Sequence, residues 1–146
     1  MANSGVRWDR AKIKKKGLAI AKAGMTEAAE YAVGEVKEML SKPGTGRVYK
    51  SRRARGGHIL HRASVPGQPP APDTGTLRRS IARRIKVIAG QVYGYVGTKL
   101  GYGENLEYGT ERVAARPFLR PVVYGKGREI AEAFKRGARR MKGVLS

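Results

Sequence analysis

The sequence predicts an α+β fold in a single domain of 146 residues. Three observations carry this prediction. Apolar residues recur at helical spacing over residues 9–41 and again over residues 127–142. Between these helices, residues 81–98 alternate as strands do, with a predicted turn at residues 89–91. A chain of this length buries roughly two thirds of its unfolded surface, so it is long enough to form a core.

The first predicted helix, residues 9–41, is amphipathic. Steps of three and four residues place its apolar and small side chains on one face, which we expect to lie on a sheet. These side chains are Leu18, Ala21, Met25, Ala28, Ala32, Val36 and Met39. Three glycines within the helix each weaken it by about 1 kcal/mol relative to alanine. We expect them to allow close packing against a neighbour, and Pro43-Gly44 to end the helix.

Residues 42–76 are predicted to form an extended arm, because glycines and prolines break any periodicity there. The arm is basic, and no acidic residue occurs between Met39 and Pro72. Loops of this length are rare inside compact domains. Two interpretations stand side by side: a solvated flexible loop, or an interaction arm that becomes ordered against a partner.

Residues 77–124 are predicted to form the sheet region. Paired strands are expected at Ile81–Ile88 and Val92–Thr98. We also expect a short strand near Asn105–Tyr108 and another near Phe118–Val123, the latter at a sheet edge because prolines flank and interrupt it. The last helix, residues 127–142, collects basic residues in its final turns, which suits the helix dipole.

Composition excludes several classes of protein. The chain has no cysteine, so disulfides, thiolate metal sites and cysteine nucleophiles are excluded. Its two histidines have no acidic residue near them in sequence, so we expect no metal or other cofactor. No apolar run approaches the ~18 residues of a membrane span, and Met1–Trp8 lacks the apolar core of a signal peptide. We therefore expect a chain made and kept in a cytoplasm, with no membrane partner.

Short motifs give no positive case for an enzyme. Asp73-Thr74-Gly75 matches the active-site triplet of aspartic proteases, but the prolines before it cannot form the central strand that this site requires. A turn is the better interpretation, with Asp73 or Thr74 capping it and Gly75 adopting an unusual backbone angle. Gly44-Thr45-Gly46 and Gly101-Tyr102-Gly103 lack the rest of a nucleotide-binding fingerprint.

The net charge of +20 favours polyanionic or acidic partners. Charge of this size gives strong, salt-sensitive binding to phosphates, and both the arm and the last helix are basic. The sequence contains no recognised module that reads nucleic acid sequence, and its basic residues occur in every segment. Non-specific contact with DNA therefore remains open, whereas sequence-specific recognition is not expected.

Four motifs in a fixed order are the most specific feature of the chain. They are Pro66-Gly67-Gln68-Pro69-Pro70, Thr74-Gly75-Thr76-Leu77-Arg78-Arg79-Ser80-Ile81, Leu106-Glu107-Tyr108-Gly109-Thr110 and Arg116-Pro117-Phe118-Leu119-Arg120-Pro121. Together they resemble the tail-completion or tail-terminator proteins of lambda-like long-tailed bacteriophages, which work at the head–tail junction. The resemblance covers about residues 66–124, with compatible helices on either side.

The resemblance implies a small α+β domain in which a mostly antiparallel sheet is packed by a long N-terminal helix and a C-terminal helix. It also implies a ring of identical subunits, expected to be a hexamer, that caps the tail tube and meets the head connector. Such a protein is structural, belongs to the virion after assembly in the host cytoplasm, and catalyses nothing. Two alternatives remain open: a head-closure or minor capsid component, and a non-sequence-specific nucleic-acid-binding protein.

Residues of the four motifs are predicted to contact neighbouring subunits or partners. The predicted interface residues are Pro66, Gly67, Pro69, Pro70, Thr74, Gly75, Leu77, Glu107, Tyr108, Gly109, Thr110, Arg116, Pro117, Phe118 and Arg120. We expect the Glu107 carboxylate to accept hydrogen bonds from loop amides or to pair with Arg116 or Arg120; an exposed strand-end glutamate is the alternative. Phe118 is expected to pack in the core, with an interface anchor as its second interpretation.

A ring at this junction would surround the route of the genome, so the basic arm would face either DNA or an acidic partner ring. The predicted contacts of this kind are Arg47, Lys50, Arg52, Arg53, Arg55 and Arg62. The resemblance itself does not explain this arginine-rich segment.

Overall fold

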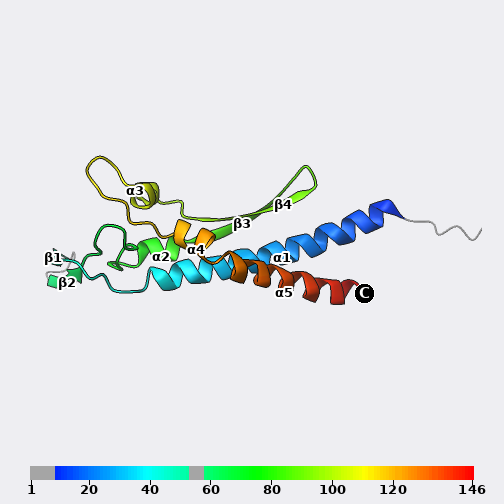
Figure 1. Ribbon diagram of the computed structural model, residues 1–146, viewed down its shortest axis with the longest axis horizontal. Helices are drawn as coiled ribbons and strands as arrows, with labels where there is room; N and C mark the ends of the chain where they lie inside the picture. The colour runs from blue at the N-terminus through cyan, green and yellow to red at the C-terminus, as the bar shows by residue number, and fades with distance from the viewer. Residues whose placement is uncertain (1–8, 53–57) are drawn as a thin grey trace, which may run out of the picture.

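The computed structural model describes residues 9–52 and 58–146 and confirms the α+β fold class. Its elements are α1 (Arg10–Met39), β1 (Val48–Arg52), β2 (His58–Arg62), α2 (Thr76–Ser80), β3 (Ala82–Ile88), β4 (Gln91–Gly97), α3 (Tyr102–Tyr108), α4 (Arg120–Gly125) and α5 (Gly127–Leu145). In Figure 1, α1 runs along the molecule with α5 beside one half of it, while β1, β2 and α3 lie toward the opposite end. The strands form two small antiparallel sheets, β1–β2 and β3–β4.

Helix α1 begins at Arg10 because Asp9 caps it. The Asp9 Oδ1 atom accepts a hydrogen bond from the backbone N–H of Lys12 at 3.0 Å. The buried face consists of small residues and one valine, at steps of three and four residues apart from the adjacent Ala28 and Ala29. They are Gly24, Ala28, Ala29, Ala32 and Val36. This face includes three of the positions expected to be apolar from the sequence, and its small side chains let other elements approach the helix closely.

The β3–β4 hairpin packs on α1 through one face. Ile85 lies opposite Gly94, and the two-residue turn Ala89–Gly90 has positive φ angles of 50° and 78°. A turn with two positive φ angles matches the right-handed twist of paired strands. The Met25 side chain fills the space that a Cβ at position 94 would occupy. The face that contains Gly94 therefore meets α1, and the opposite face is open to solvent.

The core lies where the C-terminal half of α1 meets α4 and the loop before it. Phe118, Val36 and Val122 are the largest fully buried side chains, and Leu40 and Ile81 belong to the same cluster. Full burial of such side chains stabilises a fold by about 1.5–3 kcal/mol each. The cluster thus fixes the segment that contains the fourth motif against α1.

Helices α1 and α5 approach closely at two glycines. A Cβ placed on Gly24 would lie 2.8 Å from the Phe134 ring, and one on Gly137 would lie 2.6 Å from the Ala23 carbonyl oxygen. Side-chain carbons cannot approach so closely, so this helix separation requires glycine. The packing role expected for the glycines of α1 is found at Gly24 but not at the other two, which have no neighbour within 4 Å.

Gly137→Ala is expected to lower the free energy of unfolding by about 1–3 kcal/mol, because α5 must move away from α1. This loss exceeds the roughly 1 kcal/mol by which alanine favours a helix over glycine. Gly143→Ala in the same helix is the matched control, since a Cβ at that position meets nothing within 4 Å. Urea unfolding followed by circular dichroism compares the two variants. Equal stability of both would contradict the close packing.

Two predicted strands are helices in the structure. Residues 105–108 belong to α3, and residues 118–123 are divided between a loop and α4. The strand region expected to begin at Leu77 begins instead at Ala82, after α2. A short apolar run does not distinguish strand from helix. Pro121 stands in the first turn of α4, where its missing N–H has no helical partner to lose, so it starts a helix and does not mark a sheet edge.

The arm predicted as an irregular loop is partly a hairpin. Strands β1 and β2 pair antiparallel with Lys50 opposite Leu60. The ladder continues past the strands, because the Gly46 N–H donates to the Ala63 carbonyl at 2.8 Å and the Ala63 N–H donates to the Arg47 carbonyl at 3.0 Å. The interpretation of the whole arm as a loop without structure is therefore wrong, and its role in interaction stays a prediction.

Two further expectations concern the chain as a whole. Within residues 9–52 and 58–146, no helix combines the length and the apolar character that a membrane span requires. Met1–Trp8, where the sequence lacks a signal-peptide core, lies outside the described residues. The single-domain organisation stays a prediction.

Candidate assembly site

Glu107, on α3, is a buried carboxylate with 3% of its surface exposed. Its Oε2 accepts hydrogen bonds from the backbone N–H groups of Phe118 at 2.8 Å and Leu119 at 2.9 Å. Its Oε1 accepts from the Arg120 backbone N–H at 2.9 Å and from Arg120 Nε at 3.1 Å. The first N–H groups of a helix lack partners within the helix, and α4 has no cap of its own. One carboxylate thus joins the third motif to the fourth, which confirms the predicted bonds to loop amides and Arg120.

The surroundings of Glu107 keep its carboxylate ionised. Burial raises the pKa of this carboxyl group, but hydrogen bonds from three backbone amides and the Arg120 guanidinium outweigh burial and hold the pKa below its ordinary value. Hydrogen bonds to a charged acceptor are stronger than neutral ones. The arrangement therefore suits a permanent structural anchor and not a group that exchanges protons.

Arg120 extends this anchor to the surface. Its Nη2 donates to the Glu107 backbone carbonyl at 2.7 Å, and its guanidinium lies 4.9 Å from the centre of the Tyr108 ring. Tyr108 is 64% exposed, so the stacked pair forms the outer side of the site. Two residues predicted to meet a partner are thus held together on the surface by a buried carboxylate.

Arg116 joins the fourth motif to the first. The Arg116 N–H donates to the Leu106 carbonyl at 2.6 Å, and its Nη2 donates to the Ser64 carbonyl at 3.3 Å. The Gly67 N–H donates to the Ala115 carbonyl at 3.0 Å. The alternative that Arg116 pairs with Glu107 is wrong, because Arg120 takes that position. Arg116 instead ties the proline-rich segment to α3.

The loop after α3 requires glycine at position 109. Gly109 has a φ of 77°, and a Cβ there would lie 2.8 Å from the Ala115 backbone nitrogen. Thr110 then closes a turn, since its backbone N–H donates to the Val113 carbonyl at 2.8 Å and its Oγ1 accepts from the Val113 N–H at 3.1 Å. These two motif residues shape the chain between α3 and the fourth motif.

The second motif forms a turn into α2, as predicted for Thr74 and Gly75. Thr74 Oγ1 lies 2.7 Å from Thr76 Oγ1, and Gly75 has a φ of 72°. Arg79 Nη1 donates to the Thr74 carbonyl at 3.0 Å. Leu77, the first residue of the predicted sheet region, belongs to α2 and packs partly buried against the core cluster.

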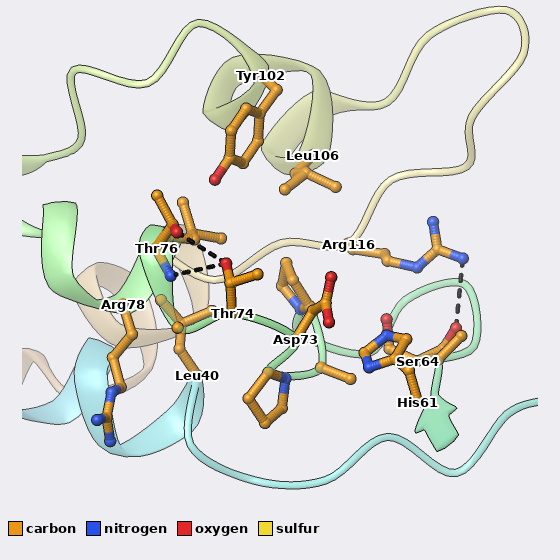
Figure 2. A pocket seen from close by; sticks show the side chains of 16 residues that line it. Leu40, His61, Ser64, Asp73, Thr74, Thr76, Arg78, Tyr102, Leu106 and Arg116 are labelled. Atoms are coloured by element: carbon orange, nitrogen blue, oxygen red, sulfur yellow. Dashed lines mark hydrogen bonds between the residues drawn. The ribbon is translucent and has the colours of Figure 1, made fainter. Parts of the chain in front are cut away.

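A groove of about 380 Å³ lies between the proline-rich segment, β2, α2 and α3. Figure 2 shows Tyr102 and Leu106 on one side of it and His61 and Ser64 near the other end. Members of all four motifs line it, namely Pro70, Thr74, Gly75, Thr76, Leu77, Arg78, Leu106 and Arg116. Among residues 9–52 and 58–146, no three histidine, aspartate or glutamate side chains are placed together to hold a metal ion.

The predicted interface residues fall into two groups. Phe118 is fully buried and Pro70 and Glu107 are also buried, so they support the site from inside the chain. Core packing, the preferred role of Phe118, agrees with this position. The exposed members are Pro66, Gly67, Thr74, Tyr108, Thr110 and Arg120, and the partly buried ones are Pro69, Gly75, Leu77, Gly109, Arg116 and Pro117. Contact of the exposed members with partners stays a prediction.

Exposed apolar side chains occur on the arm, on α3 and on the loop after α3, a feature that the sequence motifs did not reveal. We call this set the arm surface. It consists of Val48, Tyr49, Leu60, Val65, Tyr102, Tyr108 and Val113. Leu60 is 67% exposed and Tyr49 is 50% exposed. Val48 and Tyr49, a β-branched and an aromatic residue within a glycine- and arginine-rich segment, are the signal in the sequence for the hairpin that carries these side chains.

The basic arm is described in part. Arg47, Lys50 and Arg62 are exposed, and Arg62 Nη1 donates to the Gly46 carbonyl at 3.4 Å. Arg53 and Arg55 lie outside the described residues, as does the side chain of Arg52. These exposed side chains make the surface of the arm positively charged. The Arg47 guanidinium lies 5.6 Å from the centre of the exposed Tyr49 ring.

Comparison with known proteins gives one match. Residues 11–109 match the model of the family described as "Bacteriophage HK97-gp10, putative tail-component". This range includes α1, the arm, β3–β4 and α3, and it stops before the Arg116–Pro121 motif. Comparisons with curated proteins and with solved structures returned no match. Since the matched range covers more than half of the 146 residues, the chain belongs to the HK97-gp10-like family of bacteriophage tail components.

Proposed function

We propose that this phage tail component is a structural virion protein that forms a ring, expected to be a hexamer, at the head-proximal end of the tail tube and joins the tube to the head connector. The family supports a tail component. The observation that carries the finer proposal is the arm surface beside the anchored motifs. In this role the protein makes and breaks no covalent bond, and it passes from the host cytoplasm into the virion.

The arm surface has the composition of a contact between proteins. Exposed aromatic and aliphatic side chains that stand close together mark interaction sites on otherwise polar surfaces. The hydrogen bonds of Glu107 and Arg116 hold the supporting segments in place before any partner arrives. Such preorganisation lowers the entropy lost on binding. A head-to-tail contact between copies closes a ring when its rotation closes.

The charge of the arm gives it a second role in the proposal. Arg47, Lys50 and Arg62 lie exposed on or beside the β1–β2 hairpin. At the head–tail junction they would meet an acidic neighbouring ring or the phosphates of the genome. Association with an acidic ring is faster at low salt because opposite charges steer the encounter.

Oligomeric state tests the proposal. Native mass spectrometry of the full chain is expected to show one closed cyclic species. Tyr49→Ser with Leu60→Ser is expected to weaken self-association at least about tenfold, since it removes two exposed apolar side chains from the interface. Ile13→Ser with Val144→Ser is the matched control, because those side chains are 51% and 75% exposed far from the arm.

Two results would count against the ring. One is a chain that stays monomeric at every concentration and binds DNA tightly, which favours the nucleic-acid-binding alternative. The other is an equal loss of assembly in the arm variant and the control variant, which would show that the arm surface is not the contact. Circular dichroism melting of both variants checks that each is folded.

A further inference from the structure

The end of the molecule opposite the arm carries a dense cluster of cations on two helices. We call it the helix-end surface. It consists of Arg10, Lys12, Lys14, Lys15, Lys16 and Lys22 on α1 and Lys135, Arg136, Arg139, Arg140 and Lys142 on α5. All of these residues are exposed. The four motifs do not include any of them, and the proposed ring contact does not use them.

The two helices bring part of this cluster to one side of the molecule, whereas Lys14 faces the turn between β3 and β4. In Figure 1 the last turns of α5 lie beside the first half of α1. Lys16 Nζ donates to the Leu145 carbonyl at 2.9 Å, and Gly137 rests against Ala23. Between the helices runs a groove of about 570 Å³. Its lining consists of Ala19, Ala23 and Gly137, the cations Lys22 and Arg140, the carboxylates Glu27 and Glu30, and Thr26, Met141 and Val144. One cation of each helix, Lys22 on α1 and Arg140 on α5, therefore lines the groove between them.

The carboxylates of these helices do not neutralise the cluster. Glu27 lies 3.4 Å from Arg140 and Glu132 lies 2.7 Å from Lys135, so each faces one cation. Asp9 accepts the hydrogen bond that caps α1. Among the residues that the structure describes, no carboxylate lies within 4 Å of the amino groups of Lys12, Lys15 and Lys22. The positive charge of this end is thus available to a partner.

The spacing of three lysines on α1 fits an extended polyanion. Steps of three and seven residues place Lys12, Lys15 and Lys22 along one side of the helix. With a rise of about 1.5 Å per residue, the outer two lie about 15 Å apart along the axis. Duplex DNA carries one charge per about 1.7 Å, so it presents about nine phosphates over this length.

We propose that the helix-end surface binds duplex DNA through its phosphates, without preference for sequence. An acidic protein is the other polyanion to consider, but stable protein contacts are built around buried aromatic or large apolar anchors. The lining of the groove contains no aromatic side chain, and its largest apolar side chains are Met141 and Val144. Long flexible cations around a groove without an aromatic anchor suit a phosphate backbone, which offers charge and no pockets.

Fluorescence anisotropy with a labelled duplex of mixed sequence, at several salt concentrations, tests this proposal. The variant Lys12→Gln with Lys15→Gln and Lys22→Gln spares Lys16, which bonds to α5. We expect the slope of log K against log salt to fall by about 2–3 and the affinity at about 0.1 M salt to fall roughly a hundredfold, because each phosphate contact contributes about 0.9 to the slope.

The matched control removes the same charge elsewhere. Arg84, Lys99 and Arg112 are exposed and lie on β3, after β4 and after α3, so Arg84→Gln with Lys99→Gln and Arg112→Gln is expected to leave the slope nearly unchanged. Equal losses in both variants would show that the binding only follows net charge and would overturn the site. Absence of binding by the unaltered chain at low salt would overturn it as well.

Polyglutamate of matched charge separates the two kinds of partner. Tighter binding of polyglutamate than of duplex DNA at the same salt would assign the surface to an acidic protein and overturn the DNA proposal. Native mass spectrometry of the same samples reports ring formation separately. Failure of the ring and failure of DNA binding are therefore distinguishable.

Discussion

Glu107→Ala is expected to lower the free energy of unfolding by about 3–5 kcal/mol, the largest effect of any polar substitution proposed for this chain. The substitution removes the acceptor of three backbone N–H groups and leaves the start of α4 without partners. It also leaves the Arg120 guanidinium without its carboxylate. Urea unfolding followed by circular dichroism measures the change.

Glu104→Ala is the control for this substitution, because Glu104 stands on the same helix and is exposed. It is expected to change stability by less than about 1 kcal/mol. If Glu107→Ala unfolded at the same urea concentration as Glu104→Ala, and also assembled normally, the anchor role of Glu107 would be wrong.

Acid is expected to remove the contribution of the ionised Glu107 carboxylate to the free energy of unfolding. Its pKa is lowered in the folded state from the ordinary value of 4.5, with hydrogen bonding prevailing over burial. The stabilisation is therefore complete above pH 4.5 and is lost as pH falls through the lowered folded pKa. The stability difference between the unaltered chain and Glu107→Gln should narrow below pH 4.5. A difference that grows with acid would contradict the ionised anchor.

Phe118→Ala is expected to destabilise the fold by about 3–5 kcal/mol, because it leaves a cavity at the centre of the core. Phe118 is fully buried between α1 and α4, in contact with the cluster of Val36 and Val122. Loss of its ring also loosens the loop whose amides bind Glu107. The free energy of unfolding, measured in urea, reports the effect.

Tyr124→Ala serves as the control for Phe118→Ala, since Tyr124 is 80% exposed on α4. It is expected to change stability by no more than about 0.5 kcal/mol. Because Glu107 accepts from the Phe118 N–H, the two large substitutions share partners and their combined effect should not be the sum of both. Simple additivity, or a small effect of Phe118→Ala alone, would contradict a shared core and anchor.

Elements with long periodic patterns were predictable from the sequence. The pattern over residues 9–41 predicts α1, and that over 127–142 predicts α5, each within a few residues of its ends. The alternating strands around the turn at Ala89–Gly90 are also as predicted. In these elements the apolar positions of the sequence pattern lie on the face that packs against the rest of the chain. Local pattern and tertiary packing therefore favour the same structure.

Shorter elements depend on contacts distant in sequence. Residues 105–108 form a helix whose buried carboxylate bonds to residues eleven to thirteen positions later, a relation that no local pattern reveals. Pro121 was compatible with a strand edge or with a helix start, and the Glu107 carboxylate decides between them by supplying the N-terminal partners of α4. The Glu107 side chain, distant in sequence, thus determines that Pro121 begins a helix and does not mark a strand edge.

The candidate site was partly predictable. The bonds of Glu107 to loop amides and Arg120 follow from the residue types in the motifs, and the structure confirms them. The contact of Arg116 with the Ser64 carbonyl was not predictable, because it depends on how the arm returns to α3. The arm surface was missed for the same reason, since the pairing of β1 with β2 decides that Tyr49 lies on one face of the hairpin and Leu60 on the other.

Electron cryo-microscopy of phage particles that contain this chain tests the central claim most directly, namely that identical copies join through the arm surface at the end of the tail. We expect a closed ring at the head-proximal end of the tail tube, with Tyr49 and Leu60 buried between adjacent copies. Particles that lack the chain, or that hold it with these side chains facing solvent and no contact between copies, would contradict the account.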